Sequence, residues 1–191
     1  MARHPNPDLE EQILNAARKL WKKGGASALT MRAVAKAAAT NTPAVYRRFR
    51  DREDILRALL QSIRLEFAAV LRAARSPEEA CERYVDYGLS HPHDYELFYQ
   101  HEYELFYSPH SNRAGAKNTL GRPARDTMRQ KLAEKFGGEP EDYVRLNTSL
   151  WMLCHGAVML MIGKTILPKE VEESRSILTA SVAELLKRPH L

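Results

Sequence analysis

Hydrophobic residues recur along this 191-residue chain at the three- and four-residue spacing of amphipathic helices. Leu9, Ile13, Leu20 and Trp21, for example, fall on one face of a helix that ends at a pair of glycines. Similar segments follow at 31–38, 43–49, 55–71, 80–88, 92–107, 125–136, 143–162 and 171–186. No segment shows the alternation of polar and apolar residues that is typical of a half-buried strand. The pattern predicts an all-α fold of about nine helices.

Residues 30–60 predict two short helices joined by a turn, with a long third helix leaving the second. Thr30 is placed to cap the first helix, because its hydroxyl accepts a hydrogen bond from an amide of the first turn. Asn41 or Thr42 caps the second helix, and Pro43 suits its first turn, where no amide partner is lost. This arrangement is typical of a helix-turn-helix, whose second helix lies in the major groove of DNA. A capped helical hairpin with a solvated arginine cluster is the alternative interpretation.

The same stretch resembles the DNA-binding head of the TetR family of transcriptional regulators. The matching positions are Thr30, Val34, Ala35, Ala38, Asn41, Val45, Tyr46, Arg48, Phe49 and Ile55. Ala39 stands where the family has a turn glycine, so the turn either keeps a negative φ or carries strain. Thr40 replaces a core valine, and its hydroxyl therefore needs a backbone partner. Arg52 replaces a lysine, which keeps the charge and changes the geometry of a phosphate contact.

Ten residues of this stretch are candidate DNA contacts. Residues around the second helix of such a motif meet phosphate, and those in its first turns meet base edges. We assign phosphate contacts to Thr30, Tyr46, Arg48 and Arg52, and base contacts to Thr42, Pro43, Ala44 and Arg47, with Arg32 and Asn41 completing the set. An error of one residue in helix phase would exchange the roles of Arg47 and Arg48.

Basic residues concentrate at the N-terminal end of the chain. The chain carries a formal net charge of +5, from 29 Lys and Arg against 24 Asp and Glu. Residues 1–57 hold twelve of the basic and six of the acidic residues, so the whole positive excess lies there. This distribution favours contact with nucleic acid through the first 57 residues alone.

Trp151, His155 and Gly156 form a W-x-x-x-H-G signature, which resembles the WHG-type C-terminal domain of some TetR-family regulators. The resemblance divides the chain into a DNA-binding domain at 1–50 and a ligand-binding and dimerisation domain at 51–191. It implies a homodimer formed through the last two helices, with the two heads on successive major grooves of a near-palindromic, double-stranded operator. A physical argument agrees, because the helix at 150–162 is apolar almost all round and needs a second surface to cover it.

A long helix from Asp51 to Arg75 connects the two predicted domains, so a ligand that opens the C-terminal core would change the separation of the heads. The candidate walls of such a ligand site are Phe67, Tyr84, Tyr87, Phe98, Met128, Trp151, Met152 and His155. Their chemistry suits a small, mostly apolar effector that carries one or two polar groups. The alternative interpretation is an ordinary core, because methionine and aromatic residues at helical spacing are common core residues.

Other classes of protein find little support. No apolar run reaches membrane-spanning length, and the N-terminal MARHPNPDLEEQ has no apolar signal segment, which predicts a cytoplasmic protein without a membrane partner. Cys81 and Cys154 have no metal-type spacing and are expected to be buried and reduced. The histidines at 91–101 straddle a predicted helix break, and no HExxH motif or Gly-rich phosphate loop is present. We therefore expect no enzymatic activity, metal or cofactor.

The expected function is that of a homodimeric, ligand-responsive transcriptional repressor. The alternatives are a constitutive DNA-binding architectural protein, whose C-terminal half only dimerises, and a metal- or substrate-processing protein that shares the fold. Residues 108–123 have the composition of a loop.

Overall fold

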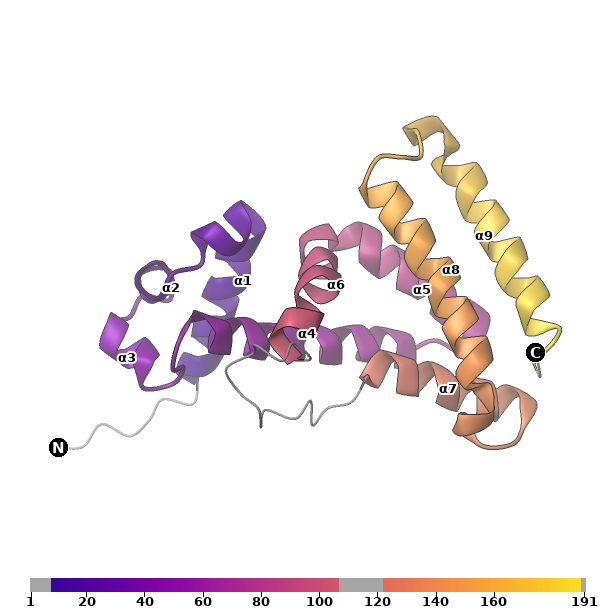
Figure 1. Ribbon diagram of the computed structural model, residues 1–191, viewed down its shortest axis with the longest axis horizontal. Helices are drawn as coiled ribbons and strands as arrows, with labels where there is room; N and C mark the ends of the chain where they lie inside the picture. The colour runs from indigo at the N-terminus through magenta and orange to yellow at the C-terminus, as the bar shows by residue number, and fades with distance from the viewer. Residues whose placement is uncertain (1–7, 107–121, 190–191) are drawn as a thin grey trace. The chain divides into compact units, whose positions relative to one another are not determined.

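The structure is a computed structural model that describes residues 8–106 and 122–189, of which 100–106 are described as backbone only (Figure 1). Within these residues it contains nine α-helices, two short 3-10 helices and no strand, which confirms the all-α prediction. Residues 108–121 of the expected loop fall outside the described residues. The segment YELFY occurs twice in the sequence, at 95–99 and 103–107, and the side chains of the second copy also fall outside them. No helix in the described part of the chain is long and apolar enough to cross a bilayer.

The chain packs as two compact units. Among described residues, the first unit holds 8–63 and 96–106, and the second holds 64–95 and 122–189. Two helices, α4 (Arg52–Arg72) and α6 (Pro92–Phe106), contribute residues to both units. The packing boundary therefore lies inside α4, and the domain boundary expected at residue 50 stays a prediction.

The first unit is built on α1 (Asp8–Ala28), α2 (Met31–Ala37) and α3 (Thr42–Tyr46), with the first three turns of α4. The regular part of α1 ends at Gly24 and Gly25, where φ and ψ leave the helical region, as the glycine pair predicts. The buried side chains of this unit form one cluster that includes Ile13, Trp21, Leu29, Val34, Val45, Phe49, Ile55, Leu59 and Leu60. We call this cluster the head core.

Side-chain caps set the starts of the helices in the first unit. The Thr30 hydroxyl oxygen accepts from the amide of Ala33 at 3.1 Å, as expected. Asn41, rather than Thr42, caps α3, because its Oδ1 accepts from the amide of Ala44 at 2.9 Å. Each such cap is worth about 0.5–2 kcal/mol, which matters for helices as short as these.

The turn between α2 and α3 closes α2 with the Schellman hydrogen-bond pattern. The amide of Thr40 donates to the carbonyl of Ala35 at 2.9 Å, and the amide of Ala39 donates to the carbonyl of Lys36 at 3.2 Å. This pattern places Ala39 in the left-handed region, with φ of 51°. The sequence left open whether this turn keeps a negative φ or carries backbone strain, and the positive φ of Ala39 shows that it carries strain.

The second unit contains α5 (Pro77–Ser90), α7 (Pro123–Phe136), η1 (Pro140–Tyr143), α8 (Val144–Ile162), η2 (Pro168–Glu170) and α9 (Val171–Leu186). Helix α8 packs against α5, α7 and α9, and α9 also contacts α5 (Figure 1). Helices α5 and α8 approach closely at Gly88, because a Cβ there would lie 2.5 Å from Cγ1 of Val158. Glycine at this position therefore fixes the packing of the two helices.

Helix α8 also ends in a Schellman pattern. The amide of Thr165 donates to the carbonyl of Leu160 at 3.0 Å, and the amide of Lys164 donates to the carbonyl of Met161 at 3.2 Å. Lys164 occupies the left-handed position, with φ of 55°.

Candidate functional site

Helix α3 presents one face to solvent and one face to the head core. Pro43 and Tyr46 of α3 are exposed, as are Arg47 at its C-cap and Arg50 in the bend that follows. The intervening Ala44, Val45 and Phe49 are buried. Tyr46 is 55% exposed although it is a large aromatic residue, and the adjacent Arg47 is also exposed. The exposed face combines apolar, hydroxyl and guanidinium groups, the chemistry that reads base edges and phosphates.

The candidate DNA contacts are distributed over the head as follows. Thr30, Arg32, Asn41, Pro43, Tyr46, Arg47 and Arg52 are exposed, and Thr42 and Arg48 are half-buried. Ala44 is only 5% exposed, so its methyl group is closed to a base, and the structure does not support it as a base contact. Arg47 is exposed, like Pro43, whereas Arg48 is half-buried.

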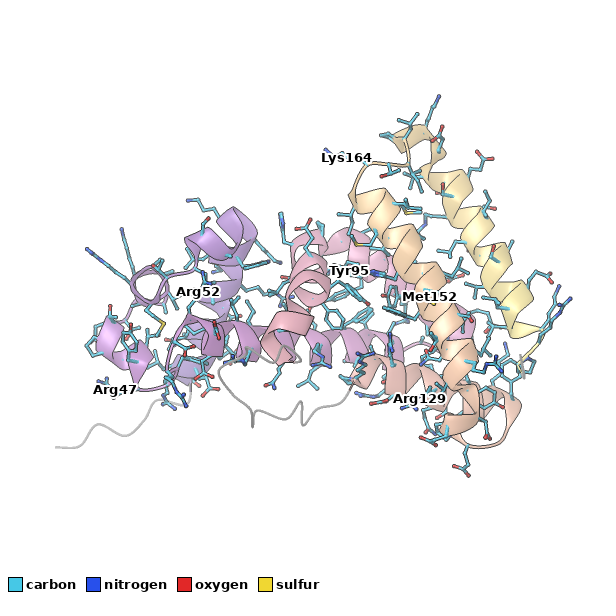
Figure 2. All side chains as sticks on the ribbon, viewed as in Figure 1. Arg47, Arg52, Tyr95, Arg129, Met152 and Lys164 are labelled. Carbon is cyan, nitrogen blue, oxygen red and sulfur yellow. The ribbon has the colours of Figure 1, made fainter. Side chains whose placement is uncertain are left out.

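Arg52 has a structural partner within the head. Its Nη1 donates to the carbonyl of Ala26 at 3.1 Å, which ties the start of α4 to the end of α1 (Figure 2). A guanidinium carries five N–H donors, so this bond leaves others for a phosphate. The sequence reading, which gave Arg52 a phosphate contact alone, missed this second role.

The second unit holds an aromatic cluster from α4 and α5. The ring of Phe67 lies 5.0 Å from that of Tyr84 and 4.8 Å from that of Tyr87, measured between centroids. All three residues are at most 6% exposed. Met128 of α7 is also buried. The structure therefore gathers Phe67, Tyr84 and Tyr87, three of the predicted ligand-site residues, in one apolar core.

A chain of hydrogen bonds runs through this core from α5 to α8. The hydroxyl of Tyr84 lies 3.0 Å from that of Tyr95, and the Tyr95 hydroxyl lies 2.7 Å from Nδ1 of His155. His155 stacks on Trp151 with an interplanar angle of 12°, and the guanidinium of Arg125 lies 4.1 Å from the Trp151 ring centroid. Polar groups placed in this way within apolar walls are able to orient a ligand.

Burial lowers the pKa of His155 below its ordinary value of 6.5. The imidazole is therefore neutral at neutral pH, with one nitrogen that donates and one that accepts. Each hydrogen bond between Tyr84, Tyr95 and His155 can therefore have either partner as its donor. The chain can thus adapt to a donor or an acceptor on a ligand.

Two predicted ligand-site residues lie elsewhere. Met152 is 61% exposed, because it lies on the outer face of α8 (Figure 2). Phe98 belongs to the first unit, where it packs against the head core. The structure supports neither as a wall of the aromatic core.

Exposed apolar side chains occur on both α8 and α9, and Met152 is one of them. Met159 and Leu160 of α8 are 39% and 46% exposed, and Ile177 of α9 is 60% exposed. Large apolar side chains exposed together on neighbouring helices are typical of a surface that another protein covers.

The matches to family models decide the class of protein. Residues 13–59 match the model of bacterial regulatory proteins of the tetR family. Residues 77–182, more than half of the chain, match the model of the tetracyclin repressor-like C-terminal domain. The chain belongs to the TetR family of transcriptional regulators. It is accordingly a DNA-binding transcriptional regulator, as the resemblance of the head predicts. A comparison with curated proteins gives no match.

Solved structures share the fold of this TetR-family regulator over nearly its whole length. A protein of unknown function from Rhodococcus sp. RHA1 is 21% identical, with a TM-score of 0.73 and coverage of 100% of this chain and 98% of that one. The multidrug binding protein EbrR, complexed with imidazole, is 19% identical, with a TM-score of 0.63 and coverage of 94% and 93%. A TetR variant from Acinetobacter baumannii AYE, in complex with minocycline, is 17% identical, with a TM-score of 0.59 and coverage of 92% of each chain. At these identities the likeness is one of fold.

Sequence reasoning missed three residues that the structure places at the candidate sites of this TetR-family regulator. Arg50 is exposed in the bend that follows α3, and the cluster of arginines at 47–52 was the signal that could have found it. Tyr95 opens the first YELFY repeat, whose aromatic periodicity gave no hint of its hydrogen bonds. Arg125 had no local signal, because its partner Trp151 is on another helix.

The described side chains contain no group of three or more His, Cys, Asp or Glu that could hold a metal ion. Among the histidines at 91–101, the side chain of His101 falls outside the described residues.

Proposed function

We propose that this TetR-family regulator is a homodimeric, cytoplasmic repressor that binds a near-palindromic operator and releases it when a small, mostly apolar effector enters the second unit. The observation that carries the proposal is the chain of hydrogen bonds that joins the buried Tyr84 and Tyr95 to the half-buried His155 beside an aromatic core. A core that only filled space would be expected to be apolar, whereas hydrogen-bonding groups in an apolar site give a ligand its orientation.

The exposed face of α3 supports sequence-specific binding to the major groove. Arg47 is placed to bind guanine in a bidentate manner, and Pro43 offers an apolar contact to a thymine methyl. The hydroxyls of Thr30 and Tyr46 are exposed and serve as phosphate donors, with Arg48 adding a charge-assisted contact.

Replacing Arg47 by Ala should cost about 1–3 kcal/mol at one operator position and relax the preference there. Replacing Arg48 by Ala should weaken all sequences about equally and lower the slope of log affinity against log salt by roughly one. An in vitro selection of operator sequences, followed by salt titrations of both variants, measures these effects. A loss of preference in the Arg48 variant at an unchanged salt slope would reverse the two roles.

A small-molecule effector is supported by the chemistry of the core and by two structures of the same fold. EbrR was crystallised with imidazole and the Acinetobacter TetR variant with minocycline, so the fold accepts ring-containing ligands. In this chain the stack of Arg125, Trp151 and His155 offers flat surfaces to such a ring. Tyr95 supplies the polar contact beside the stack.

Helix α4 supports coupling between effector and operator, because it contributes to both candidate sites. Its first residue, Arg52, is one of the proposed phosphate contacts, and Phe67 lies in the aromatic core. Its 21 residues span about 31 Å at 1.5 Å per residue. A small tilt of the helix at the aromatic core would therefore displace its other end by a larger distance. A coupling free energy of about 1–3 kcal/mol would change operator affinity about 5–150-fold.

Homodimerisation through α8 and α9 is supported by their exposed apolar residues. A charge at Met152 would lie in such an interface, and Met152→Lys should therefore produce monomers in sedimentation experiments. Leu65→Lys is the matched control, since Leu65 is 48% exposed on α4, away from α8 and α9 in sequence. If the two variants dissociate equally, or neither does, the interface lies elsewhere.

The decisive experiment compares operator affinity with and without the effector recovered by mass spectrometry from the purified protein. The wild type should lose affinity when the effector is added. Tyr95→Phe should weaken this response, because it removes the hydroxyl that links Tyr84 and His155. Tyr99→Phe makes the same change one helical turn later and should leave the response intact. An effector that leaves the wild-type affinity unchanged would favour a constitutive architectural protein.

A further inference from the structure

The second unit holds a cleft between α5 and α9 that the function proposed above does not use. The two helices pack against each other, and both pack against α8 (Figure 1). Cys81 and Val85 of α5 form one wall of the cleft, and Leu178 and Val182 of α9 form the other. The residues that line it include none of those assigned to the candidate effector site.

The walls of the cleft are apolar and the space between them is small. Their four side chains are buried, and Cys81 is a free thiol, as the sequence predicted. The volume of the cleft is about 70 Å³, which is about five to seven times the 10–15 Å³ that holds one water molecule. The cleft therefore has room for a short chain of about five to seven heavy atoms.

Two of the charged residues that line the cleft form ion pairs with residues outside it. Nη2 of Arg175 donates to Oδ1 of Asp86 at 2.6 Å, so this pair connects α9 to α5. Glu78 forms an ion pair with Lys135, which connects α5 to α7. The charges of Arg175 and Glu78 are therefore balanced within the protein.

Glu82 is the third charged residue that lines the cleft, and its charge is not balanced in this way. Its side chain is exposed one helical turn after Glu78, and it forms no ion pair among the residues that the structure describes. Together with the partners Asp86 and Lys135, the charged lining residues carry one net negative charge. The cleft thus combines apolar walls with a single negative charge at its edge.

We propose that this cleft is a second small-molecule site, which binds a short aliphatic ammonium ion. The alkyl chain lies between the apolar walls, where burial removes its methylene groups from water. The ammonium group lies at the edge beside the carboxylate of Glu82. The hydroxyl of Thr179, which lines the cleft from α9, is able to accept one of its three N–H groups. The site does not depend on the proposed effector response, because the two sites share no residue.

The test titrates the full-length protein with n-pentylammonium and follows the methyl groups of isotope-labelled valine and leucine by NMR. The probe has about six heavy atoms, which suits the volume of the cleft, and its amine resembles that of lysine and stays protonated at about pH 7.5. The methyl signals of Val85, Leu178 and Val182, assigned by single substitutions, should shift and reach saturation. The signal of Leu132, which is buried in α7 outside the cleft, should not shift. The absence of saturable shifts at the three cleft residues would overturn the proposal.

Pentanol and pentanoate are the matched ligand controls, because they keep the alkyl chain and replace the ammonium by a neutral or an anionic group. Pentylammonium should bind more tightly than either. Added salt should weaken the binding of pentylammonium and leave that of pentanol unchanged, since salt screens an exposed charge. If pentanol or pentanoate binds as tightly as pentylammonium, the cleft has no preference for a cation and the proposal is wrong.

Three variants test the two parts of the site. Glu82→Gln should weaken the binding of pentylammonium about two- to fivefold, the range for an exposed ion pair, and leave that of pentanol unchanged. Glu173→Gln is the matched control, because Glu173 is exposed on α9 but does not line the cleft. Ala183→Leu places a larger side chain at an exposed position that lines the cleft, and it should prevent binding at an unchanged midpoint of thermal unfolding. Equal weakening in the two glutamate variants, or undiminished binding to folded Ala183→Leu, would also overturn the proposal.

Discussion

Replacing Ala39 by glycine should stabilise the head of this regulator. Ala39 occupies the left-handed position of the turn between α2 and α3, with φ of 51°, and its side chain is exposed. The substitution therefore relieves backbone strain without removing a buried contact. It also leaves the two hydrogen bonds of the turn in place, since both use backbone atoms.

The magnitude follows from two opposing terms. An L-residue in the left-handed region costs about 1–2 kcal/mol, which glycine does not incur. Glycine in turn gives the unfolded chain more freedom, which costs about 0.4–1 kcal/mol on folding. The net gain expected for Ala39→Gly is about 0.5–1 kcal/mol, which corresponds to an increase of about 2–8 °C in the unfolding midpoint of a unit of this size.

The assay should report the first unit alone. The chain has two tryptophans, and Trp21 lies in the head core whereas Trp151 lies in the second unit. In a Trp151→Phe background, fluorescence therefore follows the unfolding of the head in the full-length chain. Ala37→Gly is the matched control, because Ala37 is exposed at the helical end of α2 and its replacement should cost about 0.5–1 kcal/mol. Shifts of equal sign in the two variants, or a destabilised Ala39→Gly, would refute a left-handed turn.

Three further substitutions test other parts of the structure. Lys164→Gly should raise the free energy of unfolding by about 0.5–1 kcal/mol for the same backbone reason, as measured by circular dichroism; a loss would contradict the φ of 55°. Arg52→Lys should keep the salt slope of DNA binding but weaken the tie to the Ala26 carbonyl, which should lower head stability by about 0.5–1 kcal/mol in the Trp21 assay. Burial lowers the pKa of His155 in the folded chain below 6.5, its ordinary value. The neutral imidazole therefore contributes fully to the free energy of unfolding above pH 6.5, and this contribution is lost as the pH falls through the folded pKa. His155→Gln should therefore lose less stability than the wild type between about pH 7.5 and about pH 5.5, and an identical loss would show that the imidazole is as easily protonated in the folded chain as in the unfolded one.

The head could be read from sequence because its determinants are local. Thr30 and Asn41 act on amides three residues away, so their caps are visible in the sequence itself. Ala44 was misjudged because α3 has only five residues, and its phase depends on which side chains the head core accepts. The hydrogen bond from Arg52 to the carbonyl of Ala26 joins residues 26 positions apart, so no local sequence pattern predicts it.

The second unit could be read only in part. Helix α8 is apolar on several faces, so periodicity did not separate the buried Cys154 from the exposed Met152. Phe98 was assigned to the ligand site because α6 reads as one helix, whereas the structure divides that helix between two units. The hydrogen bonds of Tyr95 join different helices, and a single sequence carries no record of such pairs.

The hydrogen bond between Arg52 and Ala26 bears on how substitutions could change the operator preference of this regulator. It joins the two ends of the segment that contains α2, the turn and α3, and the buried side chains of that segment are fixed in the head core. Pro43, Tyr46 and Arg47 point away from that core and take part in none of its packing. With the base contacts proposed above, operator preference and folding stability would be carried by different side chains of one short segment. New operator preferences can be sought by varying the outward positions together, with Arg52 and the core residues held constant.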